Sequence, residues 1–393
     1  MVLLGIDRIK EYDVRKLLSG KRLAVISSAS GLGSSMRFPV DILNEEFDVR
    51  CILAPEHGPR GVAGPGEKIS GGIDRFTGLP VYSLFEDFYS SADKTVTERA
   101  YSPSDEALSL TDMIVFDMQD VGSRYFTYVS TLFYVMRACG ARGIPLTVLD
   151  RPNPIGGAVE GCLPERKNLS FIGLTEVPIR HGMTVGELAR FYNGRYGLNC
   201  ELNVVTMSGW RRDMFWDDTS LPFVRPSPNL PTFDSVLLYN GTCMLAGTNV
   251  SEGRGTTLPF SMIGAGFIDP YAFIGELRKA ELPGVDFSPA YFRPDFSKSA
   301  GETLYGVTIH VTDKRALQPV RLGVAVINTL RSMYPDDFIF TPPKTEGGRY
   351  HIDLSVGNSD LRSKDTDTDA IINRWNEQAR RFSAETEKYR LYE

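Results

Sequence analysis

Short apolar runs alternate with segments of helical pattern along the first half of the chain. Residues 113–118 and 144–149 are apolar runs of the length expected for strands buried on both faces. Between them, residues 128–142 carry their apolar side chains at helical spacing. These three segments predict a strand, a helix and a second strand, which together form one βαβ unit.

The same alternation continues on both sides of this unit. It predicts strands at residues 22–28, 49–54, 81–84 and 201–206 and helices at residues 39–46, 104–109 and 184–196. Strands separated by helices favour a parallel sheet with helices on both faces. We therefore expect an α/β fold with a Rossmann-like, doubly wound parallel sheet.

The pattern changes after residue 209. The proline-rich run RPSPNLP is typical of a crossing between domains. We expect a Rossmann-like domain at residues 1–222 and a smaller α/β or α+β domain at residues 223–393 that closes the cleft. In the second domain the sequence predicts a strand at 305–311 and helices near 271–280, 320–334 and 369–389.

Polar residues gather where the predicted strands end. One cluster is Glu56-His57-Gly58, a second covers residues 119–124 and a third covers residues 150–154. Ligands of open α/β sheets bind outside the carboxyl ends of the strands, so we expect these clusters to face one cleft. A glycine-rich connection follows the first cluster and is much longer than the usual loop of about two to six residues, which predicts a functional or disordered segment.

Carboxylates at the strand ends are the first candidates for chemistry. Glu56, beside an imidazole, could act as a general acid or could cap a turn. Asp117, Asp120 and Asp150 could act in catalysis, or they could accept hydrogen bonds from loop amides and pair with nearby arginines.

Other polar residues suit an anionic or ring-shaped ligand. Arg124 and Tyr128 stand at the start of a predicted helix, where the positive end of the helix dipole attracts anions, although the tyrosine could equally serve in packing. Arg180 and His181 precede a capping box in which Glu187 caps its own helix, so both could face the cleft.

Glycine-rich loops carry a further set of polar residues. Glu160 lies in GGAVEG, and Glu252 and Arg254 lie in GTNVSEGRGTT. These side chains could contact a ligand or could simply be surface residues.

Composition narrows the range of functions. A net charge of −6 and a pI near 5.5 give no reason to expect nucleic acid or an anionic membrane as partner. The chain has no uninterrupted apolar stretch of the roughly 18 residues that a membrane span requires. Its N-terminus becomes polar too soon for a signal peptide, so we expect either a cytoplasmic protein or one whose leader has been removed.

Motifs for cofactors are missing from the sequence. The loop SSASGLGSSM has Met36 where a dinucleotide fingerprint needs glycine, and no P-loop motif occurs. The five cysteines and four histidines are dispersed, which favours buried free thiols and argues against a zinc site. We therefore expect no cofactor and no metal.

The motifs APEHG, FDMQDVGSRYFTY, DRPNP, VEG, RHGMTVGELA, PSPNLP and GTNVSEGRGTT occur together along nearly the whole chain. In this combination the chain resembles the exo-β-N-acetylmuramidase (NamZ-like) family, formerly a bacterial domain of unknown function. The resemblance implies a Rossmann-like domain, a smaller C-terminal domain and an active site in the cleft between them. It implies release of terminal N-acetylmuramic acid from the non-reducing ends of peptidoglycan fragments, in the periplasm or outside the cell. It also implies that Glu56 is catalytic.

Glycoside cleavage requires a proton donor and a second group on the other side of the anomeric carbon. We predict Glu56 as the acid/base. Glu160 and Asp120 compete for the second role, and the 2-acetamido group of the sugar is a third possibility. For the lactyl carboxylate we predict Arg124, Arg180 or Arg254, because a guanidinium fork matches a carboxylate.

The remaining predicted substrate-binding residues are His57, Tyr128, Asp150, His181, Asn249 and Glu252. A two-lobed binding protein for an anionic amino sugar is the alternative from another functional class. A serine or cysteine hydrolase ranks last, because the G-x-S-x-G elbow is missing.

Overall fold

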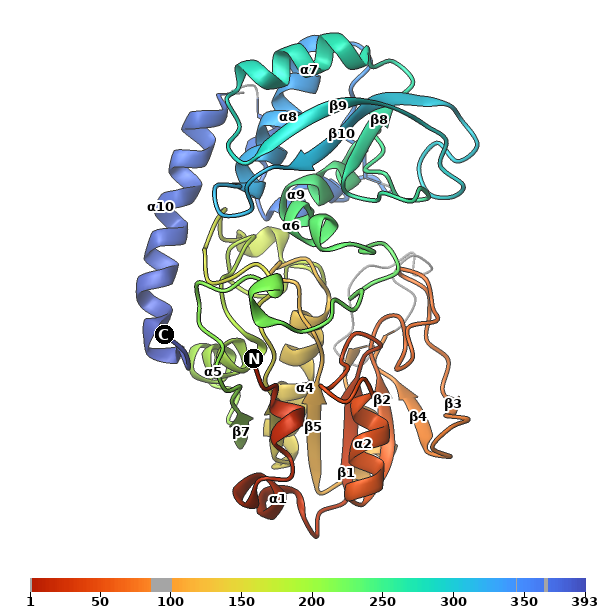
Figure 1. Ribbon diagram of the computed structural model, residues 1–393, viewed down its shortest axis with the longest axis vertical. Coiled ribbons are helices and arrows are strands. Elements are labelled where there is room, and N and C mark those ends of the chain that lie inside the picture. The colour runs from red at the N-terminus through yellow and green to blue at the C-terminus, as the bar shows by residue number, and fades with distance from the viewer. Residues whose placement is uncertain (1, 86–100, 344, 364–366) are drawn as a thin grey trace.

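The computed structural model describes residues 2–85, 101–343, 345–363 and 367–393. Two domains are stacked along the long axis of the molecule, the larger one built on the first half of the chain (Figure 1). No helix among the described residues is long and apolar enough to cross a lipid bilayer.

A seven-stranded sheet organises the larger domain. Its strand order is β3-β4-β2-β1-β5-β6-β7, and all neighbouring strands are parallel except β3 and β4. This order confirms the predicted doubly wound sheet. The strands are β1 (Leu23–Ser27), β2 (Val49–Ala54), β3 (Gly72–Ile73), β4 (Pro80–Ser83), β5 (Met113–Asp117), β6 (Leu146–Leu149) and β7 (Leu202–Val205).

Helices cover both faces of this sheet. Strand β1 shows why, because all five of its residues are buried. Ala24 and Ile26 point into the core that contains helix α4, whereas Leu23 and Val25 point into the core that contains helix α2. The helices of this domain are α1 (Tyr12–Leu18), α2 (Pro39–Glu46), α3 (Asp105–Ser109), α4 (Tyr128–Arg142) and α5 (Val185–Tyr196).

Local signals fix the ends of two helices of this domain. Helix α4 ends at Arg142 and is capped by Gly143, whose φ of 63° suits glycine, which has no Cβ. Helix α5 begins with the predicted capping box, in which Thr184 accepts from the Glu187 amide and Glu187 accepts from the Thr184 amide. The predicted role of Glu187 is therefore confirmed.

The smaller domain has an antiparallel sheet in the order β8-β10-β9, with helices packed against it. This is the α+β form of the two predicted architectures. Strands β8 and β9 and helices α6 and α9 were not predicted. The elements are α6 (Phe233–Thr242), β8 (Met262–Ala265), α7 (Pro270–Lys279), β9 (Val285–Phe292), β10 (Leu304–Val311), α8 (Pro319–Met333), α9 (His351–Val356) and α10 (Thr368–Thr386).

Helix α10 runs from the smaller domain back along the side of the larger one (Figure 1). The tail that follows it is anchored there, because the Leu391 amide donates to Glu187 and the Tyr392 hydroxyl donates to Asp150 over 2.6 Å. The predicted domain boundary near residue 222 falls in the connection before α6 and stays a prediction. All five cysteines are buried and free, as predicted.

Candidate functional site

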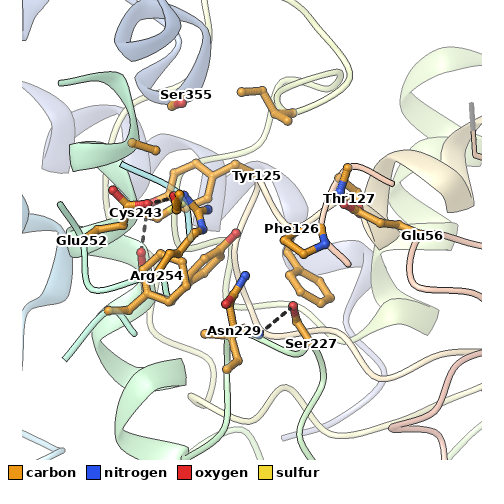
Figure 2. A pocket seen from close by; sticks show the side chains of 18 of the residues that line it. Glu56, Tyr125, Phe126, Thr127, Ser227, Asn229, Cys243, Glu252, Arg254 and Ser355 are labelled. Carbon is orange, nitrogen blue, oxygen red and sulfur yellow. Dashed lines mark hydrogen bonds and ion pairs between the residues drawn. The ribbon is translucent and has the colours of Figure 1, made fainter. Parts of the chain in front are cut away.

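A cavity of about 280 Å³ lies between the carboxyl edge of the large sheet and the loops of the smaller domain. Glu56 and Thr127 stand on one side of it, and Glu252 and Arg254 stand on the opposite side (Figure 2). The cavity therefore joins residues that are nearly 200 positions apart in the chain.

Glu56 reaches the cavity because strand β2 ends just before it. The next residues, His57 and Gly58, have φ values of 70° and 74°, so the chain turns sharply after Glu56. A non-glycine residue in this region is strained, and the His57 ring stabilises the turn through a 3.0 Å contact between Nδ1 and the Ala63 carbonyl.

Two donors orient the Glu56 carboxylate. The Gly66 amide donates to Oε1 over 2.8 Å, and the Thr127 hydroxyl donates to Oε2. Gly66 belongs to the long glycine-rich connection and Thr127 to the turn before helix α4. The carboxylate is therefore fixed from two separate segments.

The glycine-rich connection is held to the body of the domain by an ion-pair network. Arg60 donates to Asp41 of helix α2 and to Asp74 further along the connection, at 2.7 Å and 2.9 Å. Hydrogen bonds from Arg60 hold the pKa of Asp74 at about 2. The predicted functional segment is thus anchored, and it delivers Pro65 and Gly66 to the cavity wall.

The opposite wall carries a charged cluster of Glu252, Arg254 and Lys298. The Glu252 side chain is 1% exposed, and its two oxygens accept from Arg254 and, over 2.8 Å, from Lys298. Burial alone would raise the pKa of Glu252, but the two cations outweigh it and the pKa falls to about 2. With two cations and one anion, this cluster is suited to attract an anionic ligand.

The members of the cluster differ in what they can offer a ligand. Lys298 donates to the carbonyls of Leu245 and Val250 as well as to Glu252, so its three donors are all used within the protein. Arg254 lies over the ring of Phe260, 4.9 Å from its centroid, with one end held by Glu252. Glu252 and Lys298 therefore position Arg254 at the cavity.

Aromatic rings and a proline-rich segment complete the lining. Tyr239 contacts Phe260 edge-on, at 4.8 Å between ring centroids, and Phe126 contacts Tyr239 at 6.3 Å. Ser227 and Asn229 enter from the RPSPNLP segment (Figure 2). The site therefore combines an apolar wall with a few polar groups, as small-molecule sites usually do.

Four of the predicted site residues line this cavity: Glu56, His57, Glu252 and Arg254. The residue-by-residue roles stay predictions. The expected meeting of Glu56 with Asp120, Arg124 and Arg180 in one groove does not occur, because those three side chains are buried elsewhere and do not line the cavity.

Arg124 is buried between the two domains, with 1% of its surface exposed. Its guanidinium donates to the carbonyls of Cys162 and Val177 in the larger domain and to those of Ser355 and Val356 in the smaller one. Burial lowers its pKa. The donors predicted for a ligand carboxylate are largely taken up by the backbone.

The two candidates for a second catalytic carboxylate also have protein partners. Asp120 is 3.1 Å from His181 Nε2, and both are buried. Because His181 Nδ1 accepts from the Met183 amide, Nε2 carries the proton that is donated to Asp120. Glu160 pairs with Arg180 and borders two shallower grooves instead of the cavity.

The other predicted binding residues support the surrounding structure. Asp150 is fully buried and accepts from Thr184 and the Gly186 amide; burial raises its pKa to about 6 against these hydrogen bonds. Tyr128 lies behind Glu56, with its hydroxyl 3.4 Å from the Glu56 carbonyl. Asn249 bridges to the backbone of residues 337–339.

Several residues that line the cavity were not predicted from the sequence. Lys298 lies in a loop with no recognisable motif, so nothing in the sequence marked it. The asparagine and serine of RPSPNLP were visible, but we interpreted the segment as a domain crossing and a family motif and predicted no ligand contact for it. In the part of the chain that the structure describes, no three acidic, histidine or cysteine side chains are grouped to hold a metal ion.

Replacing Lys298 by methionine tests the charged cluster. The change leaves Glu252 buried with one cation fewer, so we expect a loss of about 3 kcal/mol in the free energy of unfolding. The matched control is Lys279→Met, because Lys279 pairs with Glu276 on the surface. This variant should lose about 0.5 kcal/mol or less in the free energy of unfolding. Equal stability of the two variants in chemical denaturation would contradict the cluster as described.

Comparisons with known proteins agree over the whole chain. The N-terminal domain model of exo-β-N-acetylmuramidase NamZ matches residues 23–234, and the C-terminal domain model matches residues 237–392. The peptidoglycan β-N-acetylmuramidase NamZ of Bacillus subtilis (strain 168) is 41% identical over 394 residues, covering 99% of this chain and 91% of that protein.

Two solved structures share the fold. Both are crystal structures of DUF1343 family proteins from Bacteroides fragilis. One has a TM-score of 0.89 at 32% identity and the other a TM-score of 0.77 at 27% identity, and each comparison covers 100% of this chain and 99% of the other. The chain belongs to the NamZ family of exo-β-N-acetylmuramidases, as its sequence motifs predicted.

Proposed function

We propose that this protein is an exo-acting glycosidase that releases terminal N-acetylmuramic acid from the non-reducing ends of peptidoglycan fragments. One observation carries the proposal: a single cavity presents a fixed carboxylate, Glu56, opposite a cluster with excess positive charge. The family membership gives independent support. A location in the periplasm or outside the cell is part of the same proposal, because peptidoglycan lies there.

The charged cluster explains the choice of sugar. N-acetylmuramic acid differs from N-acetylglucosamine by its lactyl group, which ends in a carboxylate. Of the three arginines predicted to bind it, Arg254 is the one that lines the cavity. Arg254 is therefore our proposed carboxylate-binding residue, with Glu252 and Lys298 as positioning residues.

The size of the cavity suits removal of one sugar at a time. Its volume of about 280 Å³ is close to the lower limit of ordinary ligand pockets, which start near about 300 Å³. A cavity of this size accepts one amino sugar with its substituents. The rest of the glycan would then extend outward past Glu56.

Glu56 is the proposed acid/base. As an acid, its carboxyl group gives a proton to the glycosidic oxygen while the bond from that oxygen to the anomeric carbon breaks. As a base, the resulting carboxylate takes a proton from the water that then attacks the anomeric carbon. The hydrogen bonds from Gly66 and Thr127 hold the carboxylate in one orientation through both steps.

In this proposal, the substrate itself supplies the group that attacks the anomeric carbon. Among the residues that the structure describes, Glu252 is the other acidic residue of the cavity lining, but its oxygens accept from two cations, which makes it a weak nucleophile. Asp120 and Glu160 lie outside the lining. The carbonyl oxygen of the 2-acetamido group then attacks the anomeric carbon as the leaving sugar departs, and water later reopens the ring that forms.

Glu56→Gln should abolish proton donation while leaving the fold intact. We expect the rate of sugar release from a muramic-acid-terminated disaccharide to fall by about 100-fold or more, since general acid catalysis accelerates such reactions by at least this factor. The activity of the variant on a nitrophenyl muramide should fall less, because the nitrophenolate leaving group needs little protonation. Release is measured by mass spectrometry for the disaccharide and by absorbance for the muramide.

The matched control for this variant is Glu67→Gln, because Glu67 is an exposed carboxylate on the same glycine-rich connection. It should behave like the wild type. Full activity of Glu56→Gln would remove Glu56 from the mechanism. Wild-type protein that binds the sugar without releasing it would favour the two-lobed binding protein instead.

Fluorinated substrates test the role of the acetamido group. Nitrophenyl muramides with one, two or three fluorine atoms on the acetyl methyl carry a progressively less nucleophilic carbonyl. We expect kcat to fall steeply along this series. A flat series would show that a protein group attacks the anomeric carbon, and Glu252 would be the first to test.

A further inference from the structure

One polar side chain of the cavity has a donor that is unpaired in the part of the chain that the structure describes. Asn229 is 6% exposed and lines the cavity, and its Nδ2 atom has no hydrogen-bond partner among the described residues. Figure 2 shows its side-chain amide pointing into the cavity, between Phe126 on one side and Arg254 on the other. Buried donors are nearly always paired, so an unpaired one in a ligand cavity indicates a place for a ligand acceptor.

The position of this amide is fixed by the local backbone. The Ser227 hydroxyl accepts from the Asn229 amide over 3.4 Å, and the Ser227 carbonyl accepts from the Leu230 amide over 3.0 Å. Leu230 is 1% exposed and anchors the segment in the core. The prolines on both sides of this turn restrict it further. Asn229 is therefore preorganised toward the cavity.

We propose that Asn229 is a specificity-determining residue that recognises the 2-acetamido group of the sugar. This rests on the proposed function. An acetamido group presents a carbonyl acceptor, an N–H donor and a methyl group. The side-chain amide of asparagine has the complementary donor and acceptor, and the aromatic wall of Phe126, Tyr239 and Phe260 is suited to the methyl group.

Charge distinguishes recognition of the acetamido group by Asn229 from recognition of the lactyl group. The lactyl carboxylate is drawn to Arg254 and its neighbours, which carry the positive charge of the cavity. Asn229 is neutral, so it matches a neutral amide better than a carboxylate. Placed at the acetamido carbonyl, it would also orient the oxygen that attacks the anomeric carbon.

Binding of the free sugars tests the proposal without depending on turnover. We would measure, by calorimetry, the binding of N-acetylmuramic acid and of its analogue with a hydroxyl in place of the acetamido group. For Asn229→Ala we expect affinity for N-acetylmuramic acid to fall by about 10- to 100-fold, the effect of one buried hydrogen bond, and affinity for the hydroxyl analogue to fall by less than about threefold. Asn229→Leu, which keeps the size and removes the donor without adding a charge, should show the same selective loss.

The matched control is Asn203→Ala. Asn203 also has a buried Nδ2 with no partner in the described ranges, but it lies in strand β7 and does not line the cavity. Asn203→Ala should bind both sugars like the wild type. Equal weakening of both sugars by Asn229→Ala, or no weakening of either, would overturn the inference. Wild-type protein that binds neither sugar would instead overturn the proposed function.

Discussion

One buried guanidinium joins the two domains beside the cavity. Arg124 donates to two carbonyls of the larger domain and to two at the end of helix α9 in the smaller one. The carbonyls at a helix C-terminus lack partners within the helix and form its negative end. An arginine there supplies both hydrogen-bond donors and a positive charge. Ser355, one of these acceptors, also lines the cavity. Removing the guanidinium would leave four buried carbonyls short of a donor where the cavity walls are joined.

With the domains fixed in this way, the cavity brings together two different electrostatic environments. On one wall, neutral donors from Gly66 and Thr127 hold Glu56. On the other wall, two cations hold Glu252 at a pKa of about 2. A sugar with a carboxylate at one end and a glycosidic bond at the other fits between these walls in one direction only. Under the proposed function, recognition and cleavage thus depend on different domains.

Much of the larger domain could be predicted from the sequence, because its signals are local. Buried strands, helical spacing and the Thr184 capping box each depend on a few neighbouring residues, and all elements of this domain except α1 and β3 were predicted. Glu56 was found for the same reason, since it directly follows a strand that ends at the binding edge of the sheet.

The long-range parts of the site could not be predicted in this way. Arg124 follows a strand and precedes tyrosines, which indicated ligand binding, but its carbonyl partner Ser355 is 231 positions away. Lys298 likewise reaches Glu252 across 46 positions. Family resemblance identified the motifs that belong together, yet the partners of each side chain follow only from the packed structure.

The most direct measurement is a crystal structure of the Glu56→Gln variant with a muramic-acid-terminated disaccharide. We expect the lactyl carboxylate at hydrogen-bond distance from Arg254, about 2.7–2.9 Å, and the glycosidic oxygen next to the glutamine side chain that replaces Glu56. A sugar bound in this cavity with its carboxylate directed away from Arg254, or with its glycosidic oxygen far from position 56, would contradict the account.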